Sequence, residues 1–196
     1  MQLLPSIELA ERKAMLVLAR RAIQMRWLNT AFQVEPLPHG ELQQGCFVTL
    51  HKHGELRGCI GTLEQDMPLQ QAIPYFAQAA AFQDPRFAPL SENELSDCII
   101  SISVLSQREP LPATQREELL APLTPFSDGL WLSDGYRRAT FLPAVWRQLP
   151  DKYDFLHHLL RKGGWQPDSW PPHMQAWRYH SLEFSERSEE RRVGKE

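Results

Sequence analysis

The chain has 196 residues, of which 42% are hydrophobic and 23% charged, as is typical of a globular protein with a sizeable core. Its formal net charge of −3 gives no broad basic surface, so nucleic acid is not an expected partner. No apolar run approaches the roughly 20 residues of a membrane span, and the N-terminus lacks the pattern of a signal peptide. We therefore expect neither a membrane partner nor export.

Three cysteines, at positions 46, 59 and 98, are too sparse and too odd in number for a disulfide framework, which favours the reducing cytoplasm. The last ten residues, 187–196, have no apolar periodicity and resemble the translation of a sequencing adapter. We expect this tail to be non-native, with the natural end near Glu186; a disordered charged tail is the alternative. The remaining 6–184 are expected to form a single domain.

In the first half, apolar residues at helical spacing predict a helix from Ser6 to about Thr30. Alternating apolar residues predict a β-hairpin over 46–63. A second helix is expected to open at Pro68, to bend at Pro74, and to end before the Asp-Pro pair at 84–85.

In the second half, strict alternation predicts a strand over 98–105, and the Asp134-Gly135 pair predicts a hairpin over 129–142 with a type I′ turn. Asp151 is the expected cap of a helix that stops at Gly163, and 177–184 is expected to be one last strand. Because helices and strands do not alternate in βαβ order, we predict an α+β fold with antiparallel pairing.

The most unusual feature is the hexapeptide 56–61. It places the guanidinium of Arg57 two residues before the thiol of Cys59, and the cysteine lies between two glycines. A strand interior normally avoids glycine, so something is expected to approach this backbone closely. A three-residue turn at 52–54 would put Arg57 and Cys59 together on the face away from the core; a two-residue turn would place Arg57 among apolar residues. The preferred register pairs Leu50 with Leu56, Val48 with Gly58 and Cys46 with Ile60.

Arg57 is the strongest functional candidate, because its fixed donors suit a carboxylate or phosphate; a salt bridge to a structural carboxylate such as Asp84 is the alternative. Cys59 is a candidate nucleophile whose thiolate a nearby arginine would favour, yet no base is tied to it, and a small buried residue is the bland alternative. Backbone amides near Gly58 and Gly61 are candidates for holding an anion.

Asp84 and Arg86 are further candidates for the same ligand site, although Asp84 is equally suited to turning the chain at a helix end. Lys162 is expected to complement a helix dipole. No metal is expected: His51 and His53 lie beside a turn, and no Cys-x-x-Cys or His-Glu-x-x-His pattern exists. The tryptophans at 165, 170 and 177 are expected to form core.

Together these residues resemble the AMMECR1 domain family over roughly 9–184. The strongest matches are 47–50, the hexapeptide, Asp84-Pro85-Arg86-Phe87 and Glu94-Leu95; weaker ones are 129–130, 141–143, 155–156, Lys162 with Gly164, and Trp170. The sequence around Trp146 resembles that of the bacterial branch of the family, called AmmeMemoRadiSam system protein A. The resemblance implies an α+β fold with a larger sheet-and-helix lobe, a smaller lobe and a cleft between them.

The family has no established reaction, so the resemblance leaves two hypotheses. One is an enzyme or enzyme component that binds a small anionic molecule through Arg57, with Cys59 acting beside it. The other is a non-catalytic accessory module for a Memo-like or radical-SAM protein. Neither hypothesis specifies a cofactor.

Overall fold

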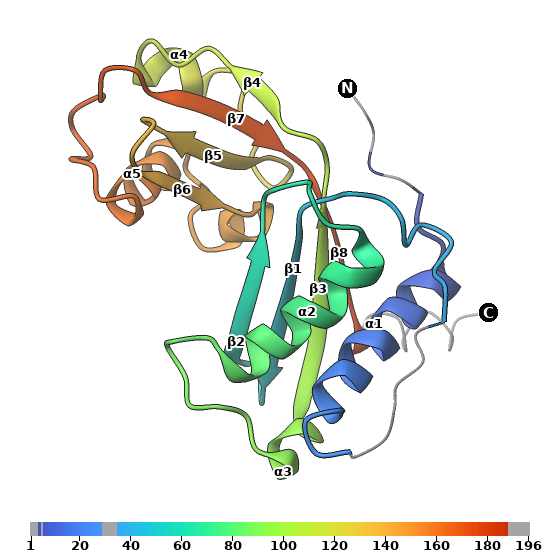
Figure 1. Ribbon diagram of the computed structural model, residues 1–196. Helices are drawn as coiled ribbons and strands as arrows, with labels where there is room; N and C mark the ends of the chain where they lie inside the picture. Colours follow the sequence, from blue (N-terminus) through green and yellow to red (C-terminus); the bar gives the residue numbers. More distant parts are fainter. Residues whose placement is uncertain (1–3, 5, 29–34, 188–196) are drawn as a thin grey trace. The chain divides into compact units, whose positions relative to one another are not determined.

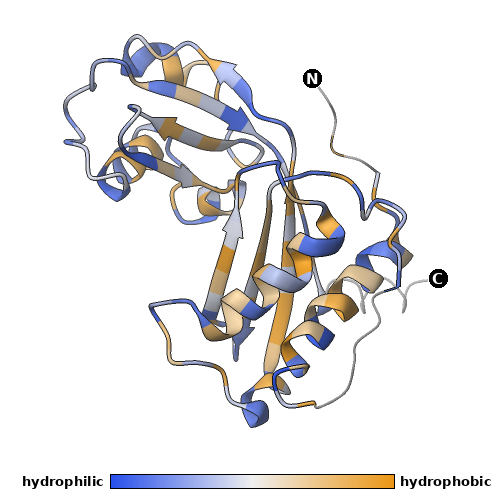
Figure 2. Ribbon diagram, viewed as in Figure 1, coloured by the Kyte–Doolittle hydropathy of each residue, from blue (hydrophilic) through white to orange (hydrophobic). Residues whose placement is uncertain are grey.

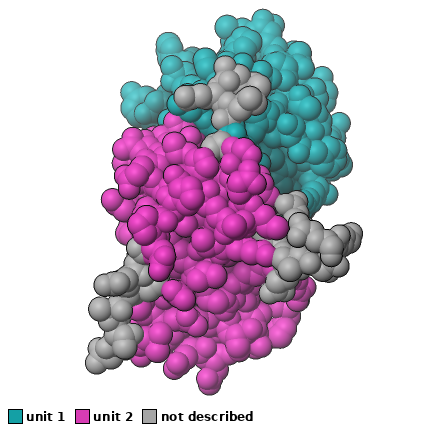
Figure 3. Space-filling model, turned by 90° about the vertical axis from the view of Figure 1, so that its right-hand side faces the viewer, with its two compact units in different colours: residues 1–4, 106–181 teal, residues 5–105, 182–196 magenta. Residues whose placement is uncertain are grey.

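The computed structural model describes residues 4, 6–28 and 35–187, and its contacts divide the chain into two compact units (Figure 3). One unit contains residues 5–105 and 182–196, and the other contains residues 1–4 and 106–181. From residue 5 onward, the chain therefore passes into the other unit at 105/106 and returns at 181/182. No helix in the described part of the chain is long and apolar enough to cross a membrane.

The first unit is a four-stranded sheet with helices against it (Figure 1). The strand order is β2-β1-β3-β8, and β1 pairs antiparallel with both β2 and β3. The elements are α1 (Leu9–Gln24), β1 (Cys46–Lys52), β2 (Glu55–Thr62), α2 (Leu69–Phe82), α3 (Glu92–Leu95), β3 (Cys98–Leu105) and β8 (Ser181–Ser185).

The core of this unit follows from the period-two alternation of its strands. Cys46, Val48 and Leu50 of β1 are fully buried, and apolar residues run along the central strands in Figure 2. Helix α2 lies against β1 and β2, and its alanine-rich end permits close packing. The predicted helix over 68–83 is confirmed, although it runs through Pro74 as one element.

The second unit is a four-stranded sheet in the order β4-β7-β5-β6, with all three pairings antiparallel. Its core centres on Trp146, whose ring stacks on Phe155 at 3.6 Å between centroids. The elements are β4 (Glu109–Leu111), α4 (Arg116–Leu120), β5 (Gly129–Ser133), β6 (Arg138–Phe141), the 3₁₀ helix η1 (Pro143–Arg147), α5 (Lys152–Lys162) and β7 (Gln175–Tyr179).

Helix α5 begins and ends where its cap residues predict. The Asp151 carboxylate accepts hydrogen bonds from the Tyr153 and Asp154 amides at 2.8 and 3.1 Å. Gly163 caps the other end, and Gly164 follows with a φ of +77°. These boundaries, the strand over 98–105 and the α+β class with antiparallel sheets are confirmed.

The predicted register of the first hairpin is wrong. Lys52 pairs with Glu55, and the turn is the two residues His53 and Gly54, both with positive φ. The register then shifts between Leu50 and His51, which leaves Arg57 as the extra residue of a β-bulge. A two-residue turn was expected to place Arg57 among apolar residues. The bulge avoids this, because Arg57 is the extra residue and has no partner in the register. As a consequence Leu56, expected in the core, is 38% exposed.

Two further predictions need correction. The segment 177–184 is not one strand: β7 ends at Tyr179 and β8 begins at Ser181, in different sheets. His180 separates them. The second hairpin pairs Ser133 with Arg138, and only Gly135 of its turn has positive φ, so the turn is not of type I′, which needs positive φ at both central residues.

Candidate functional site

The hexapeptide lies on β2, the outer strand of its sheet, so one edge of its backbone pairs with no other strand among the described residues. Cys59 lies opposite Thr49 of β1, and its sulfur is 3.1 Å from the Thr49 hydroxyl oxygen. The thiol is intermediate in exposure, whereas Cys46 and Cys98 are buried. Cys59 is therefore the most accessible of the three thiols.

Asp84 and Arg86 hold the outer edge of β2 at Cys59. The Asp84 carboxylate accepts the Cys59 backbone N–H at 2.9 Å and the Arg86 guanidinium at 2.7 Å. Arg86 in turn donates to the Cys59 carbonyl at 3.4 Å. Asp84 also accepts the Arg86 amide at 3.1 Å, which turns the chain after α2. Both backbone groups of Cys59 are thus engaged on the side away from β1.

Arg57 pairs with Glu94 of α3 rather than with Asp84. Its Nε and Nη2 atoms lie 3.3 and 3.2 Å from the two Glu94 carboxylate oxygens, and Lys52 donates to the same group at 3.0 Å. Glu94 is itself fixed by a capping box, in which it accepts the backbone N–H of Ser91 at 3.1 Å. Arg57 therefore forms a structural salt bridge, which was the alternative to ligand binding, but its partner is Glu94 and not Asp84.

These contacts hold both carboxyl groups in their charged forms. The Arg86 guanidinium beside Asp84 keeps the pKa of that carboxyl well below its ordinary value, against the opposing effect of burial. The Arg57 guanidinium, followed by the Ser91 amide and Lys52, lowers the pKa of Glu94 in the same way. The site is therefore a network of paired charges at neutral pH.

The two glycines have steric explanations. A Cβ atom on Gly58 would lie 2.1 Å from the Ala80 carbonyl oxygen of α2, so the close approach expected from the sequence is that of a helix backbone. A Cβ atom on Gly61 would lie 2.3 Å from the Cys46 carbonyl oxygen and 2.6 Å from the Phe47 Cα atom of the neighbouring strand. Ligand binding by these amides stays a prediction.

The structure brings together most of the residues singled out in the sequence. Arg57 and Arg86 both lie over the ring of Phe87, at 5.9 and 5.5 Å from guanidinium carbon to ring centroid. Sequence reasoning missed Glu94 as the partner of Arg57. The Ser91-x-x-Glu94 spacing of a capping box was the available signal, since it fixes the orientation of Glu94.

The remaining candidates lie elsewhere. Lys162 donates to the Thr140 carbonyl at 2.9 Å and lies over the Phe141 ring. Trp165 is buried in the core of its unit, and Trp170 packs against that core. Trp177 pairs with Trp131 across the sheet, 5.3 Å between ring centroids. Among the described residues, no three His, Cys, Asp or Glu side chains gather as metal ligands would.

A family model described as AMMECR1 matches residues 16–184. Protein MJ0810 of Methanocaldococcus jannaschii is 35% identical over 152 residues, covering 74% of each chain. A protein of Methanothermobacter thermautotrophicus is 34% identical over 181 residues, covering 90% of this chain and 94% of its own. The crystal structure of uncharacterized protein PH0010 from Pyrococcus horikoshii matches with a TM-score of 0.82 and 30% identity, covering 92% of this chain and 93% of that one.

Proposed function

The chain belongs to the AMMECR1 family, and we propose that it is a non-catalytic protein-interaction module whose hexapeptide edge docks a partner protein. One observation carries the proposal: both backbone groups of Cys59 and the charges of Arg57 and Asp84 are already engaged within the chain. The Arg57 side chain is only 14% exposed, so little of it is open to an anion from solvent. We propose that these paired charges hold the hexapeptide edge in shape, and that the exposed side chains beside them contact the partner.

The surface beside these paired charges suits a protein partner. Leu56 is 38% exposed and the Arg86 side chain 54% exposed, beside the Phe87 ring. Arginine and aromatic side chains are enriched at the energetic centres of protein interfaces. Because Asp84 and Arg86 occupy the edge of β2 at Cys59, we propose docking through side chains rather than by addition of a strand.

The partner class comes from the resemblance: a Memo-like or radical-SAM protein in the cytoplasm. Assignment to the bacterial AmmeMemoRadiSam branch belongs to the same proposal, since the relatives described above are archaeal. The free thiols of Cys46 and Cys98 are compatible with a reducing compartment.

The test is calorimetric titration of the purified chain with a purified Memo-like or radical-SAM protein. Leu56→Asp and Arg86→Ala are expected to weaken the complex at least tenfold, while Cys59→Ser leaves it intact. Tyr75→Ala, on the exposed face of α2 at 56% exposure, is the matched control. Equal affinities for all four variants, with normal circular dichroism spectra, would reject docking at this edge.

A second candidate function is the small anionic ligand site, and the exposed guanidinium of Arg86 beside Cys59 favours it. It predicts that Cys59 is alkylated rapidly near neutral pH, because a cation favours the thiolate. It also predicts that Cys59→Ser and Arg57→Lys abolish activity while the partner complex persists. Alkylation of Cys59 only above pH 8, or only after unfolding, would remove this candidate.

A further inference from the structure

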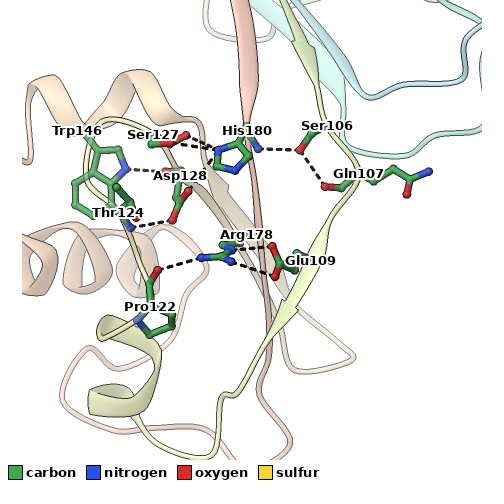
Figure 4. Close-up of polar contacts among 10 residues, drawn as sticks. All are labelled: Ser106, Gln107, Glu109, Pro122, Thr124, Ser127, Asp128, Trp146, Arg178 and His180. Carbon is green, nitrogen blue, oxygen red and sulfur yellow. Dashed lines mark hydrogen bonds and ion pairs between the residues drawn. The ribbon is translucent and has the colours of Figure 1, made fainter. Parts of the chain in front are cut away.

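A second polar cluster lies in the other unit, around the residue that separates β7 from β8 (Figure 4). The backbone of His180 is fixed by Ser106: the His180 amide donates to the Ser106 hydroxyl, and the Ser106 amide donates to the His180 carbonyl, each at 2.9 Å. The imidazole is 35% exposed. The ring is thus anchored at its base and open to a small molecule.

The surroundings of Nδ1 decide which ring nitrogen carries the proton. Nδ1 lies 3.2 Å from the Ser127 carbonyl oxygen and 3.4 Å from Oδ1 of Asp128. Both are pure acceptors, so Nδ1 is the protonated nitrogen of the neutral ring. The Ser127 hydroxyl, at 3.3 Å, can act as an acceptor too. Nε2 therefore presents its lone pair, and it has no hydrogen-bond partner among the described residues.

Asp128 is held firmly beside this nitrogen. Its carboxylate is 1% exposed and accepts the Thr124 amide at 2.8 Å, and its carbonyl accepts the buried indole N–H of Trp146 at 2.6 Å. A buried carboxylate fixed in this way orients a histidine, because it stabilises one tautomer and one ring position.

A cavity of about 220 Å³ adjoins the ring. Arg178 lines it and donates to both oxygens of Glu109 at 2.9 and 3.0 Å and to the Pro122 carbonyl at 3.1 Å. These bonds use three of the five N–H groups of a guanidinium, so two remain for a ligand. The lining residues are 106–110 and 178–180.

We propose that this cavity binds a small hydroxycarboxylic acid. The lone pair of His180 Nε2 accepts the hydroxyl hydrogen, and the spare N–H groups of Arg178 receive the carboxylate. Both residues line the cavity, and they are two positions apart in the sequence. This site is independent of the hexapeptide edge, which lies in the other unit.

The first test is the tautomer of His180 in the full chain. Two-bond hydrogen–nitrogen correlation spectra at pH 8.5 should show His180 with its proton on Nδ1, whereas exposed histidines favour Nε2. Asp128→Asn should shift His180 toward the Nε2–H form, and Asp168→Asn, an exposed residue of the same unit, should not. A wild-type His180 protonated on Nε2 would overturn the proposal.

The second test is binding of malate and lactate, followed through the His180 ring signals, with sodium chloride at equal ionic strength as the blank. Malate should shift the His180 signals, and His180→Asn should weaken its binding at least tenfold. His173→Asn is the matched control, since asparagine tolerates the φ of 63° at that position. If neither acid shifts His180, or if His180→Asn binds malate unchanged, the ligand class is wrong. If His180→Asn fails to fold, the wild-type tautomer and the malate shift decide.

Discussion

Gly58 and Cys59 show how a motif of chemically suggestive residues is used to fit a strand beneath a helix. Gly58 admits the Ala80 carbonyl of α2, and the next residue turns its backbone N–H outward to Asp84. Gly58 lets β2 lie close to α2, and the bond from Cys59 to Asp84 holds the outer edge of the strand. Much of the unusual character of the hexapeptide is thereby explained at the level of single residues.

Gly58→Ala is expected to destabilise the chain by about 1–3 kcal/mol, because the added methyl group overlaps the Ala80 carbonyl oxygen. Urea unfolding followed by circular dichroism measures the loss. Since the overlap is with backbone, Ala80→Gly should not rescue the variant. An unchanged unfolding midpoint in Gly58→Ala would contradict this packing.

The three thiols are expected to react with iodoacetamide in a fixed order. Burial raises the pKa of Cys46 to about 12 and also raises the pKa of Cys98, so neither forms thiolate near neutral pH. In native protein at pH 8, Cys59 should be labelled at least tenfold faster than the other two, as read by peptide mass spectrometry. Cys59→Ser should remove the fast phase, and a fast phase that persists would contradict the burial of the other thiols.

At the scale of elements, the short helix α3 positions the partner of Arg57. Its capping box fixes Glu94, which lies 37 residues from Arg57 in sequence and receives Lys52 as well. A four-residue helix has little stability of its own. The ion pairs to β1 and β2 and the capping box therefore support each other.

Glu94→Gln should lower the free energy of unfolding by about 1–3 kcal/mol at pH 7, because Arg57 keeps a mostly buried charge without its carboxylate. Glu92→Gln, an exposed change in the same helix, should have little effect. Urea titrations of both variants at pH 7 measure the difference. Equal stabilities would mean that Glu94 and Arg57 do not interact in solution.

For the whole molecule, the lowered pKa values of Asp84 and Glu94 contribute to the response to acid. A carboxyl whose folded pKa is below its unfolded value stabilises the fold above the unfolded pKa, about 3.9 for Asp and 4.3 for Glu, and loses this contribution as pH falls further. The free energy of unfolding should therefore decline below about pH 4.5.

The measurement is urea unfolding at pH 7, 5 and 3. The double variant Asp84→Asn, Glu94→Gln should start less stable and lose less between pH 5 and pH 3 than the unmodified chain. Asp168→Asn, an exposed residue in the other unit, is the comparison variant. Identical pH profiles for the double variant and the unmodified chain would show that other groups govern acid unfolding.

Local signals alone determined several elements of this protein. The caps at Asp151 and Gly163 gave the bounds of α5, and strict alternation gave the strand Cys98–Leu105. These features depend on residues close in the chain, whose hydrogen bonds and side-chain periodicity are readable directly. The α+β fold class and the antiparallel pairing followed from the order of the helices and strands along the chain.

Only the tertiary structure decided the register of the first hairpin and the partners within the site. The bulge at Arg57 reconciles a short turn with a charged residue beside an apolar face, and sequence spacing does not reveal it. Glu94 and Arg57, like His180 and Asp128, meet through folding across long stretches of chain. Likewise, the split of 177–184 at His180 depends on which sheet each half joins, because a strand takes its partners from distant segments.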